Sequence, residues 1–218
     1  MIKHVIFDLD GVIRGIKNTP ISEILPRRLK AKYSKQFQGV GLLAFIAKYL
    51  PMNVFKEWDK GHVKTKDVIE EVIKVADEPA EVVENALNAA LKKEHNFIYQ
   101  DTINLIKKLK QEGFKTYILS NMCVEVVELM SQMFDFEMFD GIIFSGDVGM
   151  RKPDIEIYQY TLDKWGIDPK ESIFVDDSAK NLEPFTVLGG HTFHFDNKNL
   201  NQSLATLYEV VNKTEASI

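Results

Sequence analysis

The sequence is poor in cysteine, in long apolar runs and in positive charge, and each shortage excludes a class of protein. Cys123 is the one cysteine among 218 residues, so no internal disulfide can form. No apolar run approaches the ~20 residues that a membrane span requires. Lys and Arg number 27 against 32 Asp and Glu, and the formal net charge of −5 argues against a nucleic-acid backbone as partner. We therefore expect no disulfide scaffold, no membrane and no nucleic acid.

We also expect no secretory signal in this sequence, because acids interrupt the strand-like run at residues 2–7 within the first ten positions. The cytoplasm is therefore the expected compartment. The chain does contain 45% hydrophobic residues, which is enough for a buried core. Its length fits one large domain, or a core domain with a smaller insertion.

Short β-rich runs alternate with helical patterns along most of the chain. Strands are expected at residues 2–7, 116–119, 141–144, 172–175 and 191–195. Helices are expected over residues 102–112, 124–134, 153–165, after the fourth strand as far as 188, and around 204–211. Pro153 stands at the favoured first position of its helix. This alternation predicts an α/β fold with a parallel sheet covered on both faces.

One block breaks the alternation, because residues 18–95 show helical periodicity and no strand pattern. One apolar stripe begins at Val68 and runs to Ile73, with Thr65 as the expected N-cap. A second stripe runs from Val82 to Ala90. We predict a helical cap at residues 18–95, inserted into an α/β core that comprises residues 1–17 and 96–218.

Polar residues follow the predicted strands at the points where the strands end. In an open parallel sheet, ligands bind beyond the carboxyl ends of the strands. If the sheet is parallel, one edge gathers all of these side chains: Asp8, Asp10, Ser120, Asn121, Lys152, Asp176 and Asp177.

Four acids in one crevice are unstable together. Two carboxylates ~4 Å apart repel by ~4 kcal/mol at an effective dielectric constant of ~20. Lys152 alone does not balance four charges, whereas a divalent cation would. All-oxygen ligands favour Mg²⁺ over zinc, and Mg²⁺ often binds a substrate phosphate as well. We therefore expect a Mg²⁺ site for a small phosphorylated substrate, with Ser120, Asn121 and Lys152 on the phosphate oxygens.

Four segments in order, "VIFDLDG", "YILSN", "RKPDIEIY" and "IFVDDSAKN", resemble the four motifs of the haloacid dehalogenase superfamily. The resemblance covers nearly the whole chain, and the helical block stands where that family carries its cap. It implies a three-layer α/β/α, Rossmann-like core with strand order 5-4-1-2-3. The stretch "SGDVGMRKPDIEIYQ" is further similar to a branch with α-glucose-1-phosphate phosphatases and the N-terminal phosphatase domain of soluble epoxide hydrolases.

The resemblance also implies roles for the motif residues. Asp8 would be the nucleophile that forms an aspartyl-phosphate, and Asp10 the acid and base that moves the proton. Ser120 would bind the phosphoryl group, and Lys152 would neutralise charge. Mg²⁺ would be held by Asp8, the Asp10 carbonyl and the acid pair, with Asp177 as the direct ligand and Asp176 acting through water. Asn181 would brace the acid-pair loop.

The reaction implied is hydrolysis of a small phosphorylated metabolite, with a sugar phosphate as the first candidate. Dehalogenases of the superfamily lack the second acid of the first motif, and Asp10 is present here. A phosphomutase of the β-phosphoglucomutase type is an alternative, although residues 14–18 hold no histidine where that branch uses one. A non-catalytic binding protein on the same fold is another. The chain would act as a monomer or as a homodimer, for which an exposed apolar patch on the cap or on the C-terminal helix around 204–211 is a candidate.

Several further residues have two interpretations. Arg14 would contact substrate because it follows Asp10 closely. In the cap, Trp58, Lys60, Gly61 and His62 either line the substrate pocket or pack and turn. Cys123 is expected to be a buried thiol, because no histidine supports a nucleophile there. Residues 39–44 match a GxGxxA dinucleotide fingerprint, but no strand pattern precedes them.

Overall fold

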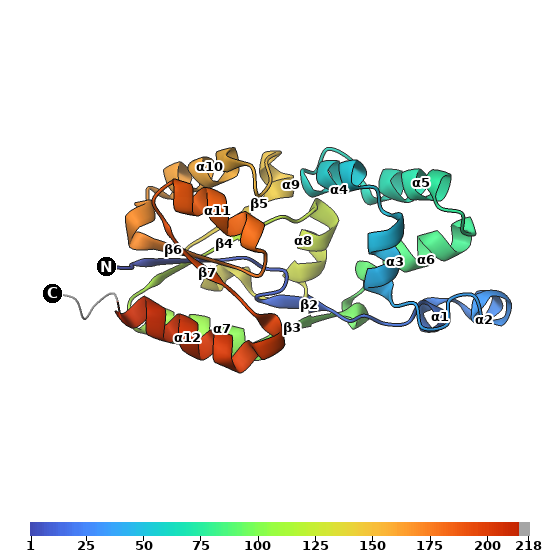
Figure 1. The fold of residues 1–218 in the computed structure, drawn as a ribbon, viewed down its shortest axis with the longest axis horizontal. Helices are drawn as coiled ribbons and strands as arrows, with labels where there is room; N and C mark the ends of the chain where they lie inside the picture. The colour runs from blue at the N-terminus through green and yellow to red at the C-terminus, as the bar shows by residue number, and fades with distance from the viewer. Residues whose placement is uncertain (214–218) are drawn as a thin grey trace.

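A five-stranded parallel sheet forms the centre of the protein in the computed structural model, which describes residues 1–213 (Figure 1). Its strands are β1 (His4–Phe7), β4 (Lys115–Ser120), β5 (Gly141–Phe144), β6 (Ser172–Asp176) and β7 (His191–His194). They lie in the order β5-β4-β1-β6-β7. Counted along the chain, this is the predicted order 5-4-1-2-3 read from the opposite edge, so the predicted α/β core is confirmed. The last five residues of the predicted core, 214–218, lie outside the described residues.

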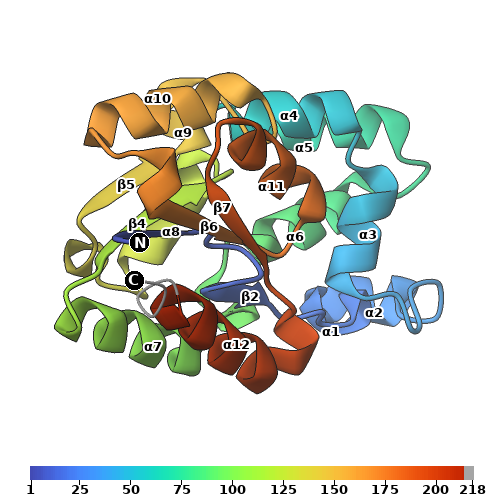
Figure 2. The same ribbon diagram turned by 60° about the vertical axis from the view of Figure 1, so that its left-hand side comes forward.

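Helices cover both faces of the sheet because successive strand residues point to opposite sides (Figures 1 and 2). Val5 and Phe7 pack in one apolar cluster with α7 (Gln100–Gln111), α8 (Val124–Ser131) and α12 (Leu200–Lys213). Ile6 packs in a second cluster with α10 (Ile155–Trp165) and α11 (Ala179–Val187). Short helical turns connect these elements: α9 (Ser145–Val148), η1 (Lys93–His95), η2 (Phe136–Met138), η3 (Pro169–Glu171) and η4 (Asn197–Asn199).

Six helices form the insertion that follows the first strand, and they lie beside one end of the sheet (Figure 1). They are α1 (Ile21–Ile24), α2 (Arg27–Tyr33), α3 (Leu42–Tyr49), α4 (Met52–Asp59), α5 (Thr65–Val75) and α6 (Ala80–Ala90). The predicted stripes are buried, as Val68 and Val72 on α5 and Val82 and Ala86 on α6 illustrate. The helical insertion is therefore confirmed, and it shares one apolar cluster with the core.

Two helix starts were predicted wrongly. The N-cap of α5 is Lys64, and the backbone N–H of Thr65 instead donates to Glu125 Oε1 at 2.9 Å. The helix α10 begins at Ile155 with Asp154 as its N-cap, so Pro153 is not its first residue. The reason is a turn, in which the Asp154 N–H donates to the Arg151 carbonyl at 2.9 Å.

A short antiparallel pair, β2 (Arg14–Ile16) and β3 (Asn96–Ile98), was not predicted. It stands where the chain leaves the core for the cap helices and where it returns. Gly15 permits the close approach, since a Cβ atom there would lie 2.2 Å from the Phe97 ring. Each strand has three residues, which is too few for a period to stand out in the sequence.

The expected apolar patch on the C-terminal helix is also corrected. Leu204, Leu207 and Val211 of α12 are buried in the core cluster that includes α7, so they are not available to a second copy of the chain. Tyr208 adds a hydrogen bond from its hydroxyl to Glu112 Oε1 at 2.7 Å. Across residues 1–213, no helix combines the length and apolarity that crossing a membrane would take.

Candidate active site

The register of β1 on β6 brings two acids to the same level of the sheet. Phe7 pairs with Val175, and the Asp8 N–H donates to the Val175 carbonyl at 2.8 Å. Asp8 and Asp176 therefore stand side by side at the carboxyl edge, and Asp177 follows. Carboxylate oxygens of these three residues lie within 4.8 Å of one another.

Lys152 is the cation of this group. Its ammonium lies 3.0 Å from Asp8 Oδ1 and 2.6 Å from Asp176 Oδ2, and its side chain is 1% exposed. The ring of Phe174 lies under it, 5.1 Å from Nζ to the centroid. Burial lowers the pKa of Lys152, but the attraction of Asp8 and Asp176 outweighs it and raises the pKa above its usual value. The lysine therefore stays protonated between the two acids.

The negative charges of the three acids together exceed the single positive charge of Lys152. Burial raises the pKa of Asp8 well above its usual value; Lys152 opposes this effect and the charge of Asp176 adds to it. Burial and the charge of Asp176 also raise the pKa of Asp177. A further cation held by these oxygens would relieve this repulsion.

The two acids of the pair have different surroundings. Asp176 is fully buried and accepts hydrogen bonds from Lys152, from the Ser178 N–H at 2.8 Å and from the Asn181 amide at 3.0 and 3.1 Å. Asp177 is half-buried, and among residues 1–213 its carboxylate accepts one hydrogen bond, from Asn197 Nδ2 at 3.2 Å. Asp177 is therefore the better placed of the two to give an oxygen to a ligand, while Asn181 holds Asp176.

Ser120 and Asn121, at the end of β4, differ in what they offer. Ser120 Oγ is buried beside Asp8, where a hydrogen bond between the two side chains lowers the pKa of that acid, and it has no other partner among the described residues. The Asn121 side chain accepts from the Lys152 N–H at 2.7 Å and donates to the Lys152 carbonyl at 2.8 Å. Asn121 was expected to contact phosphate, whereas here it fixes the backbone of the lysine.

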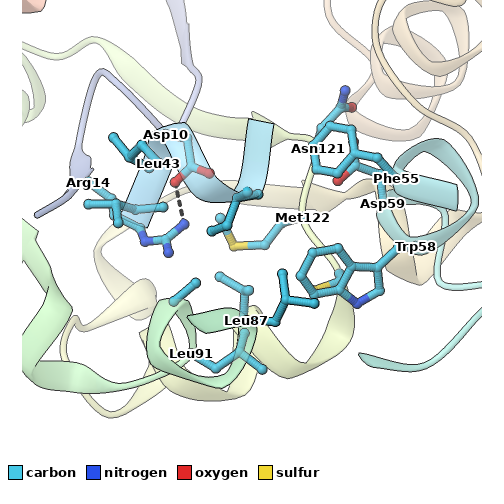
Figure 3. A pocket seen from close by; sticks show the side chains of 15 residues that line it. Asp10, Arg14, Leu43, Phe55, Trp58, Asp59, Leu87, Leu91, Asn121 and Met122 are labelled. Atoms are coloured by element: carbon cyan, nitrogen blue, oxygen red, sulfur yellow. Dashed lines mark hydrogen bonds and ion pairs between the residues drawn. The ribbon is translucent and has the colours of Figure 1, made fainter. Parts of the chain in front are cut away.

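Asp10 is partly exposed and is paired with Arg14. Its side chain is 46% exposed, and its Oδ1 accepts a hydrogen bond from Arg14 Nη1 at 2.5 Å (Figure 3). Arg14 also donates from Nε and Nη2 to Asn96 Oδ1 at 2.8 and 2.5 Å. Sequence reasoning missed Asn96, because it lies beyond the cap region and outside every motif.

A cavity of about 240 Å³ lies between the cap helices and the core, next to Asp10 (Figure 3). Leu43, Phe55, Trp58, Leu87 and Leu91 line it from the cap side, and Asn121, Met122 and Cys123 line it from the core side. Burial raises the pKa of the Cys123 thiol to about 12, so the expected buried thiol is confirmed.

Of the four cap residues considered for substrate contact, Trp58 alone is among the residues that line the cavity. His62 is half-exposed and lies 2.8 Å from Glu57 Oε2. Gly61 packs on the core, where a Cβ atom would lie 2.5 Å from the Gly146 carbonyl. Lys60 borders a different hollow, beside Asp154. Lys60, Gly61 and His62 therefore do not line this cavity, and Gly61 serves the contact between cap and core.

A buried ion pair that no sequence pattern predicted also joins the cap to the core. Arg151 Nη2 donates to Asp59 Oδ2 at 2.9 Å, and the two side chains are 8% and 7% exposed. Ser145 Oγ donates to the Asp59 carbonyl at 2.5 Å. Since Arg151 precedes Lys152, the cap is tied directly to the segment that carries the buried lysine.

Comparison with known proteins gives this arrangement a context. A protein-family model described as haloacid dehalogenase-like hydrolase matches residues 2–189. The sesquiterpene phosphatase astK of Aspergillus oryzae is 33% identical over 108 residues, which cover 49% of this chain and 53% of that protein. The bifunctional epoxide hydrolase 2 of Rattus norvegicus is 34% identical over 88 residues, covering 37% of this chain and 16% of that protein. The chain thus spans about half or less of these relatives.

A solved structure shares the fold over nearly the whole chain. It is a HAD family enzyme from Bacteroides thetaiotaomicron in complex with magnesium and inorganic phosphate. The TM-score is 0.63 at 22% identity, with 90% of this chain and 96% of that chain covered. The likeness extends through both the sheet and the helical insertion.

Proposed function

Because the chain belongs to the haloacid dehalogenase-like hydrolases, we propose that it is a Mg²⁺-dependent phosphatase that hydrolyses a phosphate monoester through an aspartyl-phosphate on Asp8. The observation that carries the proposal is the position of Lys152, 3.0 Å from Asp8 and 2.6 Å from Asp176. A buried ammonium at that position stabilises negative charge on both an attacking carboxylate and an incoming phosphate.

The first half of the reaction transfers the phosphoryl group. An oxygen of Asp8 attacks phosphorus, and the bond from phosphorus to the substrate's bridging oxygen breaks. Asp10, protonated at this point, gives its proton to that oxygen and so releases a neutral alcohol. Ser120 Oγ lies next to Asp8 and would donate to a phosphoryl oxygen bound there.

The second half returns the enzyme to its starting state. Asp10, now a carboxylate, removes a proton from water while the water oxygen attacks phosphorus. The bond between phosphorus and Asp8 breaks, which regenerates the carboxylate and releases inorganic phosphate. Arg14 holds Asp10 by a 2.5 Å hydrogen bond, so it orients the group that moves the proton in both halves.

The residues present fit Mg²⁺. Oxygens of Asp8, Asp176 and Asp177 lie close together, the donors are all oxygen, and the cluster carries excess negative charge. Asp8, Asp177 and the Asp10 carbonyl would hold the ion, with Asp176 held back by Lys152 and Asn181. When bound, the ion would supply positive charge to the phosphate and to Asp8.

The test is hydrolysis of p-nitrophenyl phosphate with and without MgCl₂, in the wild type and in Asp8→Asn. Activity that needs the metal and falls to background in Asp8→Asn supports the proposal. Asp163→Asn, at an exposed position on α10, is the matched control and should keep full activity. Release of halide from 2-haloacids, or turnover of a sugar phosphate that depends on an added bisphosphate, would instead indicate a dehalogenase or a mutase.

A further inference from the structure

The cavity beside Asp10 is apolar over most of its wall. Of its 15 lining residues, the polar ones are Asp10, Arg14, Asp59 and Asn121. The remainder are aliphatic side chains, Phe55, Trp58, Met122 and Cys123. Figure 3 shows leucine side chains and the indole of Trp58 directed toward the same space.

The polar groups of the wall are already engaged elsewhere. Arg14 bonds to Asp10 and Asn96, and Asp59 bonds to Arg151. Both ends of the Asn121 amide bond to the Lys152 backbone. The indole N–H of Trp58 donates to Thr65 Oγ1 at 3.2 Å, outside the cavity lining. The wall therefore offers few hydrogen bonds to a guest molecule.

The apolar cavity wall favours an apolar organic group of the substrate over a sugar. A sugar would bring several hydroxyls into the cavity, and each hydroxyl left without a partner costs free energy. An alkyl, prenyl or aryl group needs no partner and gains free energy by leaving water. Asp10 lies in the same wall, so a group in the cavity can be attached to the oxygen that Asp10 protonates.

We propose that the substrate is a phosphate monoester of an apolar alcohol, whose organic group occupies this cavity; this rests on the proposed phosphatase function. An apolar cavity of ~150 Å³ accommodates benzene. By proportion, about 240 Å³ accommodates roughly ten carbon atoms. The cavity therefore specifies both the apolar character and the upper size of the organic group, in place of the sugar expected from the motifs.

A chain-length series tests this directly. With ethyl, butyl, hexyl, octyl and dodecyl phosphate below their micellar concentrations, kcat/KM should rise about fourfold per CH₂ and level off near ten carbons. Glucose 1-phosphate and glucose 6-phosphate should fall at or below the ethyl ester. A flat series, or a preference for either sugar phosphate, would overturn the inference while leaving the phosphatase intact.

Two substitutions on α6 should shift the preferred alkyl chain length of the substrate in opposite directions. Ala90→Leu narrows the cavity and should lower kcat/KM for octyl phosphate at least tenfold more than it lowers kcat/KM for ethyl phosphate. Leu87→Ala widens the cavity and should shift the preferred substrate toward dodecyl phosphate. Asn88→Leu places the same leucine at an exposed position of α6 and should leave the series unchanged. An unchanged chain-length profile in both cavity variants would contradict the proposal even if one of them folds poorly.

Binding separates this inference from the proposed function. Octylphosphonate, which is not hydrolysed, should bind in the presence of MgCl₂ with at least tenfold higher affinity than methylphosphonate, and Ala90→Leu should remove the difference. That result without turnover of any ester would support the apolar site and refute the phosphatase. Equal affinities for the two phosphonates would refute the apolar site, whatever the turnover.

Discussion

Gly11 leaves the space that the carboxylate of Asp177 occupies. A Cβ atom on Gly11 would lie 2.0 Å from Asp177 Oδ2, far inside van der Waals contact. Gly11 also has a φ of +77°, in the left-handed region that favours glycine. The glycine that follows the two acids of the first motif therefore both turns the chain and admits an acid from the fourth motif.

Gly11→Ala should therefore impair the reaction more than it impairs the fold. The methyl group displaces Asp177, and a shift of about 1 Å in a reacting or metal-binding group can cost ~10²-fold in rate. We expect kcat/KM for p-nitrophenyl phosphate to fall by about that factor. Gly113→Ala is the matched control, since Gly113 has a φ of +96° and nothing within 4 Å of its Cβ position. That variant should lose about 1 kcal/mol of unfolding free energy and keep its activity. Equal activity losses in the two variants would contradict the argument.

The Asp59–Arg151 pair should stabilise the contact between cap and core. Asp59→Asn leaves the Arg151 guanidinium buried without a compensating charge, which typically costs about 3–5 kcal/mol. We expect a lower melting temperature, measured by calorimetry, and a lower kcat, because Arg151 precedes Lys152. Glu57→Gln removes the acid that pairs with His62 at an exposed site of the same helix, and should leave the melting temperature close to that of the wild type. A melting temperature for Asp59→Asn equal to that of Glu57→Gln would show that the ion pair contributes nothing.

Local patterns made it predictable that polar side chains gather at one edge of the sheet. Val5, Ile6 and Phe7 form an apolar run that ends on Asp8, and a parallel sheet gathers such strand ends on one edge. Ser120 and Asp176 follow from the same reasoning, because each is the last residue of its strand. Lys152 stands eight residues after β5, and its place before the next helix was the sign in the sequence. The helical insertion was predictable from periodicity alone.

Long-range partners were not predictable. Arg14 bonds to Asn96, 82 positions away, and Arg151 bonds to Asp59, 92 positions away, and neither pair lies in a local pattern. Leu87 and Ala90 read as ordinary core positions of an amphipathic helix. Whether such a stripe packs fully or lines a cavity depends on how the cap is placed relative to the core. The apolar periodicity of one helix does not determine that placement.

Of the two adjacent acids Asp176 and Asp177, we expect Mg²⁺ affinity to depend more on Asp177. At a concentration 100 times the dissociation constant, Mg²⁺ should stabilise the fold by about 2.7 kcal/mol. Asp177→Asn should remove most of the resulting rise in melting temperature, because it weakens a charged oxygen ligand. Asp163→Asn serves again as the control and should retain the full rise. Retention of the full rise in Asp177→Asn would exclude this residue as a direct ligand.

Asp140 should make stability depend on pH independently of the active site. Burial opposes its ionisation, but hydrogen bonds from Lys110, the Thr116 N–H and Lys115 outweigh burial and lower the pKa of Asp140 to about 2. An Asp in an unfolded chain has a pKa of about 3.9. A lowered folded-state pKa contributes stability that is fully present above pH ~4 and is lost as the pH falls toward ~2.

The contribution of Asp140 is about 1 kcal/mol once solvent screening of its lysine partners is allowed for. In urea unfolding, Asp140→Asn should therefore be less stable than the wild type by about that amount at pH 7, and the difference should shrink steadily between pH 4 and pH 3. Lys110→Met should remove part of the same difference, and the double variant should lose less than the sum of the two single losses. A difference that stays constant from pH 7 to pH 3 would mean that packing, and not the charge of Asp140, stabilises this corner of the sheet.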